Sequence, residues 1–194
     1  MVAAGRAARA AGAVAVAAAL VVLAGGASGA SGAGGVGGGH GGDGFRSRSH
    51  ASFAPPNAFV APSAVTYDME RVPAGARIEI TQHSDRSGTV VEARLRGLLP
   101  DHAYGMHVHT SPCGADPKSA GPHYRHRAEG PAGPAGEVWL DFATDAEGDG
   151  SSRARHDWGF REGGARSVVI HDRQGGAGDR LACYTVPFGS YGTV

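Results

Sequence analysis

Three histidines and a cysteine gather in one short segment of this chain, residues 103–124, with the sequence AYGMHVHTSPCGADPKSAGPHY. His107 and His109 stand two apart in a stretch that predicts a β-strand, so both imidazoles lie on the same strand face. Two imidazoles on one strand face can bind a single metal ion. His123 follows a loop rich in proline, glycine and serine, which can return the chain to the same place. Three neutral imidazoles suit copper or zinc better than magnesium or calcium.

Other short motifs follow this histidine pair in order along the chain. They are Cys113, the run AGPH that ends at His123, the run VVIH that ends at His171, and the run RLAC from Arg180 to Cys183. A histidine pair alone fits a solvated strand face equally well. The ordered set, however, resembles the copper/zinc superoxide dismutase family over roughly Ala64 to Val186.

The resemblance implies roles for five residues. His107, His109, His123 and His171 match the copper ligands of the family, and Arg180 matches its active-site arginine. Imidazole ligands allow copper to cycle between Cu(II) and Cu(I). In that cycle one superoxide leaves as O₂ and the next leaves as H₂O₂, while the metal carries the electron. The guanidinium beside copper would attract and orient the superoxide anion.

Two departures from the family pattern concern the zinc site and the loop over the metal. In the family the third copper histidine also bridges to zinc, and two further histidines and an aspartate complete that site. Between His123 and the strand that begins near Glu137, this chain offers only His126, which follows His123 too soon. A tetrahedral zinc needs four ligands, so we expect copper without zinc. The loop between His171 and Arg180 is also short, and both losses resemble the copper-only branch of the family, which includes extracellular enzymes.

Without zinc, another group must hold the ring of His123. A metal-bound histidine usually donates its other ring N–H to a carboxylate or a carbonyl. Glu137 falls about where the family has its zinc aspartate, so we expect it to contact His123, with Asp141 as the next candidate. A solvated glutamate at a strand end is the alternative. The remaining histidines of this region are interpreted as surface or structural residues: His102, His126 and His156.

The chain has two cysteines, Cys113 and Cys183. Two cysteines in an exported protein most simply form one disulfide, and the resemblance implies the same pair. The bond would tie the loop after the histidine pair to the C-terminal strand. Two free thiols that bind metal are the alternative, but thiolates beside a redox-active copper would tend to oxidise.

A set of short strands must position all of these residues. From Ala64 onward, short alternating segments are separated by turn signals, and no helical period appears. The pattern predicts an all-β fold: an eight-stranded antiparallel Greek-key β-sandwich or barrel of the immunoglobulin-like, superoxide dismutase type. The predicted strands are 64–67, 76–82, 89–96, 103–109, 137–143, 151–158, 166–172 and 181–187.

The N-terminal segment, residues 1–30, has the pattern of a secretory signal peptide. Arg6 and Arg9 precede an apolar run and then a series of small residues. The apolar run is too short to span a bilayer comfortably, which takes about 20 residues. Residues 31–57 are rich in glycine and serine and predict a flexible linker, which leaves 58–194 as the superoxide dismutase-like domain. We therefore expect a secreted, extracellular protein with no membrane contact after signal removal.

The charge balance bears on the partners of the protein. The 194 residues include 18 basic and 18 acidic side chains, and this neutrality gives no argument for a nucleic-acid partner.

The sequence predicts an exported, copper-dependent superoxide dismutase with superoxide as its small-molecule substrate, and it makes no prediction of the oligomeric state. The alternatives are a non-catalytic extracellular protein that binds or buffers copper, and a domain that has lost its metal. Arg180 argues against a carrier, which gains nothing from a cation beside copper, and the intact histidine motifs argue against loss of metal.

Overall fold

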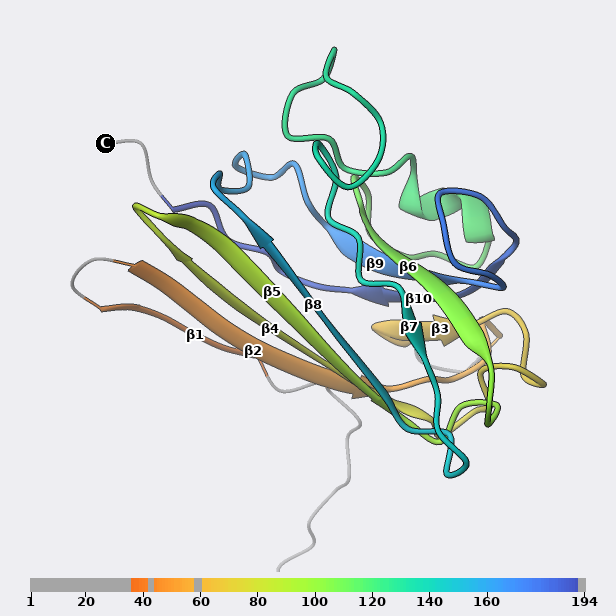
Figure 1. Ribbon diagram of the computed structural model, residues 1–194. Coiled ribbons are helices and arrows are strands. Elements are labelled where there is room, and N and C mark those ends of the chain that lie inside the picture. Colours follow the sequence, from red (N-terminus) through yellow and green to blue (C-terminus); the bar gives the residue numbers. More distant parts are fainter. Residues whose placement is uncertain (1–35, 42–43, 58–60, 192–194) are drawn as a thin grey trace, which may run out of the picture. The chain divides into compact units, whose positions relative to one another are not determined.

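The computed structural model describes residues 36–41, 44–57 and 61–191, and the predicted signal peptide lies outside these residues. The described chain forms two antiparallel sheets that face each other (Figure 1). The first sheet has the order β1 (Val36–Gly41), β2 (Gly44–Ser52), β4 (Arg77–Asp85), β5 (Gly88–Arg96) and β8 (Gly150–His156). The second has the order β3 (Ala64–Thr66), β10 (Arg180–Thr185), β9 (Ser167–His171), β6 (Ala103–His109) and β7 (Phe142–Ala143). One short 3-10 helix, η1 (Pro117–Ala120), lies in the loop after β6.

Alternating apolar side chains from both sheets form one core. Strands β4 and β5 turn their apolar residues inward and their polar residues outward, with the period of two that a half-buried strand requires. The same cluster contains apolar residues of the second sheet, which joins the two layers. Its members from β4, β5, β6 and β9 include Ile78, Ile80, Val91, Ala93, Leu95, Met106, Val108 and Ile170. The predicted all-β sandwich of antiparallel strands is therefore confirmed. Within the described part of the chain, no helix is long and apolar enough to cross a membrane.

For residues 36–41 and 44–52, the structure corrects the prediction of a flexible linker over residues 31–57; the rest of the predicted linker before residue 44 lies outside the described residues. Strand β2 lies within this range and pairs with β4 over its whole length, from Gly44 to Ser52. Phe45 and Phe53 are buried at the two ends of this segment, on the face that points into the sandwich. The composition is poor in apolar residues, but backbone hydrogen bonds to a neighbouring strand do not depend on composition. The described residues therefore form ten strands, two more (β1 and β2) than the eight that the sequence predicts.

The strand predicted at 137–143 is shorter in the structure. Only Phe142 and Ala143 form β7, while residues 137–141 run beside β6 with isolated bridges such as His107↔Trp139. Asp141 explains part of this irregularity, because its carboxylate accepts the Met106 N–H at 3.0 Å. The Met106 N–H thus donates to a side chain, whereas in a regular β-ladder it would donate to a backbone carbonyl of the neighbouring strand.

Candidate metal centre

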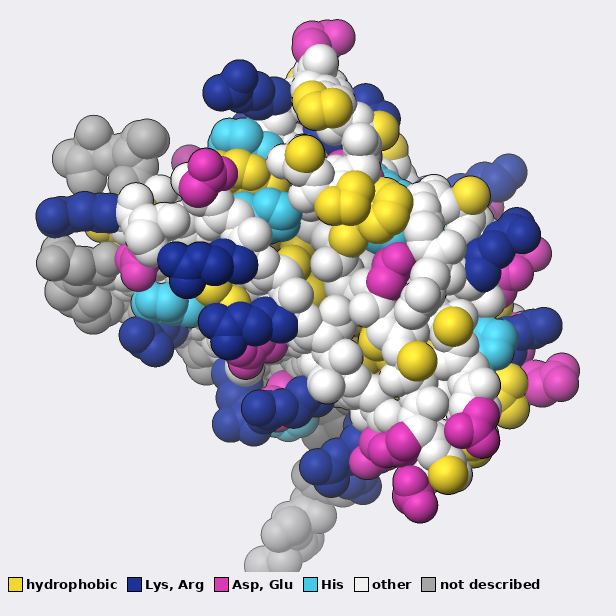
Figure 2. Space-filling model, viewed as in Figure 1, with side chains coloured by type: hydrophobic (Ala, Val, Ile, Leu, Met, Phe, Trp, Pro, Cys, Tyr) yellow, Lys and Arg dark blue, Asp and Glu magenta, His cyan; other side chains and the backbone are white. Residues whose placement is uncertain are grey.

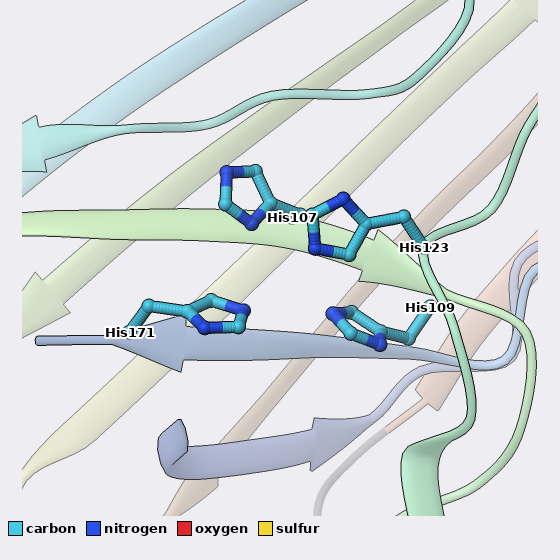
Figure 3. Close-up of side chains that lie close together, drawn as sticks. All are labelled: His107, His109, His123 and His171. Carbon is cyan, nitrogen blue, oxygen red and sulfur yellow. The ribbon is translucent and has the colours of Figure 1, made fainter. Parts of the chain in front are cut away.

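Two neighbouring strands and one loop bring four histidines together. His107 and His109 point outward from β6, on the side of the second sheet away from the core (Figure 3). His171 ends the adjacent strand β9, where it lies opposite Gly105 of β6. His123 follows η1 and forms an isolated bridge with His109, so the loop returns to β6 as its composition predicts.

The four rings form one compact cluster. One nitrogen from each lies within 4.8 Å of the corresponding nitrogens of the others, and this is the one group of three or more potential metal ligands among the described residues. The ring centroids of His107 and His123 are 4.4 Å apart, and those of His109 and His171 are 5.8 Å apart. Three of the rings are buried, whereas the side chain of His123 is 17% exposed. His123 therefore lies at the solvent-facing side of the cluster.

The hydrogen bonds of the rings leave a set of nitrogens without partners. The Nδ1 atom of His109 lies 3.0 Å from the Gly121 carbonyl oxygen, and that of His171 lies 3.2 Å from the Gly178 carbonyl oxygen. A carbonyl only accepts, so both Nδ1 atoms carry the proton and both Nε2 atoms present a lone pair. These Nε2 atoms are buried and have no hydrogen-bond partner. Buried polar atoms rarely lack a partner, and this pattern is typical of metal-ligating histidines whose other nitrogen is held by the protein.

Burial also keeps three of the rings neutral. It lowers the pKa of His107 to about 4, with a further contribution from the nearby His123 ring, and it lowers the pKa of His109 to about 2. Burial lowers the pKa of His171 as well. At neutral pH these imidazoles therefore carry free lone pairs, and a metal would not have to displace protons from them.

Glu137 supports the fourth ring. Its carboxylate is buried and lies 2.9 Å from His123 Nδ1, 2.8 Å from Trp139 Nε1 and 3.3 Å from Arg125 Nε. Burial alone would raise the pKa of Glu137, but the hydrogen bonds from Trp139 and His123 outweigh it and leave the pKa below its usual value. An ionised carboxylate fixes the proton of His123 on Nδ1 and turns Nε2 toward the other rings. The structure thus places Glu137 where the sequence predicts, in contact with His123.

Two other residues of the same segment line the site in ways that the sequence analysis missed. The indole of Trp139 lies 4.9 Å from the His107 ring, centroid to centroid. Asp141 faces His107 and not His123: Asp141 Oδ1 lies 3.1 Å from His107 Nε2, outside hydrogen-bond geometry. Glu137, Trp139 and Asp141 alternate along the chain, and this period of two could have identified all three as one face toward the metal ligands.

The short loop after β9 packs directly against β6. At Gly105 a Cβ atom would collide with the carbonyl oxygen of Arg173, so a glycine is required for this close approach. The carboxylate of Asp141 also accepts the N–H of Gly175 at 2.8 Å. These contacts hold the loop beside the cluster without any helix or strand of its own.

Arg180 lies at the start of β10, opposite His171 in the strand register. Its guanidinium is half-buried and donates to the carbonyl oxygens of Pro117 at 2.9 Å and Gly121 at 2.7 Å. Gly121 has a positive φ of 72°, a conformation that favours glycine. The same Gly121 oxygen accepts from His109, so one carbonyl restrains both a ring of the cluster and the nearby cation.

The predicted disulfide is confirmed, because Cys113 and Cys183 are bonded. Cys183 is fully buried on β10, and Cys113 lies in the loop that carries Gly121. The Cys113 N–H also donates to Thr185 Oγ1 at 3.0 Å. The bond therefore ties the loop beside the metal cluster to the C-terminal strand, and no thiol is free among the described residues.

Three further histidines that the sequence analysis singled out, His102, His126 and His156, take part in packing. His102 packs against Tyr104 with a centroid distance of 4.5 Å. His126 and His156 both stack on Trp158, at 4.6 Å and 4.1 Å. None of the three belongs to the metal cluster, so they lie where a structural interpretation expects them.

Comparisons with known proteins identify the family. No curated protein sequence matches this chain. Among solved structures, a double mutant of a SOD-like protein from Bacillus subtilis is 21% identical, with a TM-score of 0.43, and the match covers 57% of this chain and 88% of that one. A single mutant of a SOD-like protein from Bacillus subtilis is 20% identical, with a TM-score of 0.42 and coverage of 66% and 98%. The Cu/Zn superoxide dismutase from Brucella abortus is 18% identical, with a TM-score of 0.40 and coverage of 63% and 97%.

The family model described as copper/zinc superoxide dismutase (SODC) matches residues 74–186, which is more than half of the chain. This range contains all four clustered histidines, both cysteines and Arg180. The chain belongs to the copper/zinc superoxide dismutase family.

Proposed function

We propose that this protein is an exported superoxide dismutase that uses copper and no zinc, and that converts superoxide to O₂ and H₂O₂. The observation that carries the proposal is the set of buried, unpartnered imidazole nitrogens that face one another from His107, His109 and His171. Neutral imidazoles in this arrangement suit copper in both of its oxidation states. Copper, when bound, supplies the electron exchange: it takes an electron from one superoxide and returns it to the next.

The protein residues hold and orient the ligands. His109 and His171 are fixed by backbone carbonyls, and His123 is fixed by Glu137. Each of these contacts sets the tautomer of a ring and leaves Nε2 for the metal. Because these rings are already oriented, little reorganisation would accompany a change in the charge of the metal.

Arg180 would act on the substrate. Its guanidinium remains protonated and offers no lone pair, so it is no metal ligand. It lies across the strand pair from His171, and its positive charge acts on the rings of both His109 and His171. Superoxide is an anion, and a cation near the reaction site raises its local concentration. Arg180 therefore favours an enzyme over a non-catalytic copper carrier.

The surroundings of His123 support a site without zinc. Arg125 and Trp139 share the carboxylate of Glu137 with His123, so this carboxylate accepts from a cation and an indole N–H as well as from the ring. The His126 ring stacks on Trp158 at an interplanar angle of 13° and takes no part in the cluster. Glu137 then fixes the orientation of the His123 ring, as a zinc ion bound to that ring would do.

Two features support export. Residues 1–30 have the composition of a signal peptide, and the Cys113–Cys183 disulfide suits an oxidising compartment.

We expect the mature protein to bind one copper per chain and no stoichiometric zinc. Metal content measured by mass spectrometry after loading with both metals, together with superoxide decay by pulse radiolysis on the same sample, tests the proposal. Glu137→Gln is the matched variant, because it removes the charge that fixes His123 and should weaken copper retention without adding zinc. Recovery of a full equivalent of tightly bound zinc beside copper would contradict the copper-only assignment.

Replacement of Arg180 separates an enzyme from a carrier. We expect Arg180→Ala to slow superoxide decay and Arg180→Glu to slow it further, because the attraction for the anion is lost and then reversed. Arg180→Lys is the control: it keeps the charge but loses the forked contact with the Pro117 and Gly121 carbonyls, so a rate near wild type assigns the effect to charge. Copper content is measured for each variant.

Raised salt should slow the wild type modestly, because the screening length is about 10 Å at 0.1 M ionic strength. Equal rates for the wild type and all Arg180 variants would remove this arginine from the mechanism. A copper-loaded wild type no faster than the copper-free protein would favour the carrier.

A further inference from the structure

The first sheet presents arginines on its outer face. Side chains alternate in and out along its strands, and every arginine of β2, β4, β5 and β8 is at an exposed position of this alternation. We call this surface the arginine face, and its members are Arg46, Arg48, Arg77, Arg94, Arg96, Arg153 and Arg155. These four strands contain seven arginines and three acidic residues. The whole chain, in contrast, contains 18 basic and 18 acidic residues. Basic side chains gather over this sheet in Figure 2.

Ion pairs neutralise only part of the arginine face. Glu79 lies 2.6 Å from Arg48 and 3.6 Å from Arg94, and Glu92 lies 2.8 Å from Arg153. Other members, Arg46, Arg77 and Arg155, form no ion pair with any described residue. Exposed pairs of this kind contribute little, so an incoming anion can displace them at small cost.

Cross-strand register arranges the arginines in rows. Arg46, His83, Val90 and Arg155 lie side by side across four strands, and the next row begins with Arg48 and ends with Arg153. Neighbouring strands are about 4.8 Å apart and same-face residues about 7 Å apart. The four arginines at the row ends therefore mark a rectangle of about 14 by 7 Å.

A shallow depression lies over these rows. Its volume is about 460 Å³, and its lining includes Arg46, His83, Arg153, Arg155 and His156. His83 Nε2 lies 3.1 Å from Asp85 Oδ2, and the Nδ1 atom of the same ring is buried without a partner. Two carboxylates, Asp85 and Glu92, also line this hollow and pair with His83 and Arg153, so Arg46 and Arg155 supply the guanidinium groups that have no ion pair with a described residue.

The chemistry and size of the arginine face select its occupant. The guanidinium fork matches the oxygens of a phosphate with two parallel hydrogen bonds. A single small anion would reach only neighbouring arginines, whereas the charges extend across four strands. The four strands carry no outward Phe, Tyr or Trp side chain that could stack on a base. Met69, the one large apolar side chain exposed among the described residues, lies outside them, so no side chain of this face could insert into a bilayer.

We propose that the arginine face binds a linear polymer of phosphate groups that has neither bases nor lipid tails. The face and the histidine cluster lie on opposite sides of the sandwich, because each points away from the shared core. A polymer bound on the first sheet therefore leaves the metal centre uncovered. The binding would retain the protein at a phosphate-rich surface while the cluster stays open to small anions.

Fluorescence anisotropy with labelled long-chain inorganic polyphosphate tests the proposal on the full mature protein. Arg153→Ser/Arg155→Ser should weaken binding by about tenfold or more, because two charge-assisted contacts are lost. Arg166→Ser/Arg173→Ser is the matched control: it removes the same charge from exposed residues beside β9, on the other sheet, and should change binding by less than about twofold. Circular dichroism verifies that both double variants are folded.

Several outcomes would overturn the proposal. Equal losses in the two double variants would mean that net charge and not the arginine face attracts polyphosphate. Tighter binding to single-stranded DNA, to heparin or to anionic vesicles would assign the face to a base-bearing, a sulfated or a lipid partner instead. The measurement requires neither copper nor turnover, so its result stands apart from the fate of the proposed dismutase activity.

Discussion

Replacing His109 or His171 by alanine is expected to remove copper and abolish superoxide turnover while the β-sandwich stays folded. Each change deletes a buried nitrogen that has no partner in the protein. The folded state should survive, because the core side chains of the same strands, such as Val108 and Ile170, are untouched. Copper content, pulse radiolysis and far-UV circular dichroism on the same preparations measure the three properties.

The matched control is His50→Ala. His50 is exposed on β2 in the first sheet, so this variant removes an imidazole without touching the cluster. It should keep wild-type copper content and activity. Wild-type copper and turnover in His109→Ala or His171→Ala would refute the ligand assignment.

The second large effect is expected from the disulfide. Loss of the Cys113–Cys183 bond should lower the free energy of unfolding by about 4 kcal/mol, as the chain-entropy model gives for a loop of this length, since the two cysteines are 70 residues apart. Copper should also bind more weakly, because Cys113 anchors the loop whose Gly121 carbonyl holds His109. Urea unfolding and a copper competition titration, each with and without reductant, measure both effects.

Cys113→Ser/Cys183→Ser provides the control for this experiment. The double variant should match the reduced wild type and should not respond to reductant. A peptide map of the exported protein with two free thiols would contradict the prediction. Unchanged copper affinity after reduction would show instead that the loop holds His109 without the bond.

The sequence predicts the two-layer fold well where strands alternate strictly. Strand β6 has the predicted bounds, Ala103–His109, because its apolar residues face the core and its histidines face away. Strand β2 was missed for a physical reason. Its residues are mostly glycine, serine and arginine, and its order comes from backbone pairing with β4 and from two phenylalanines, Phe45 and Phe53. The amino-acid composition of a segment indicates how many of its side chains can be buried. It does not indicate whether the backbone will form hydrogen bonds with a strand that comes later in the chain.

The candidate site was predictable to the level of its motifs and no further. The histidine set came from the ordered motifs, and the contact of Glu137 with His123 followed from its place before a strand. Which ring Asp141 faces depends on how the irregular segment 137–141 lies against β6, and periodicity alone does not give that. Trp139 reads as an ordinary half-buried aromatic residue until the structure places its indole against His107.

The shared carbonyl of Gly121 couples two parts of the site. The His109 ring and the Arg180 guanidinium both donate to this one oxygen, so a displacement of the loop would release both side chains together. If the proposed function holds, such a molecule would lose one support of its copper ligands and the position of its cation in the same event. One backbone oxygen would then make metal retention and substrate attraction sensitive to the same local unfolding of the loop.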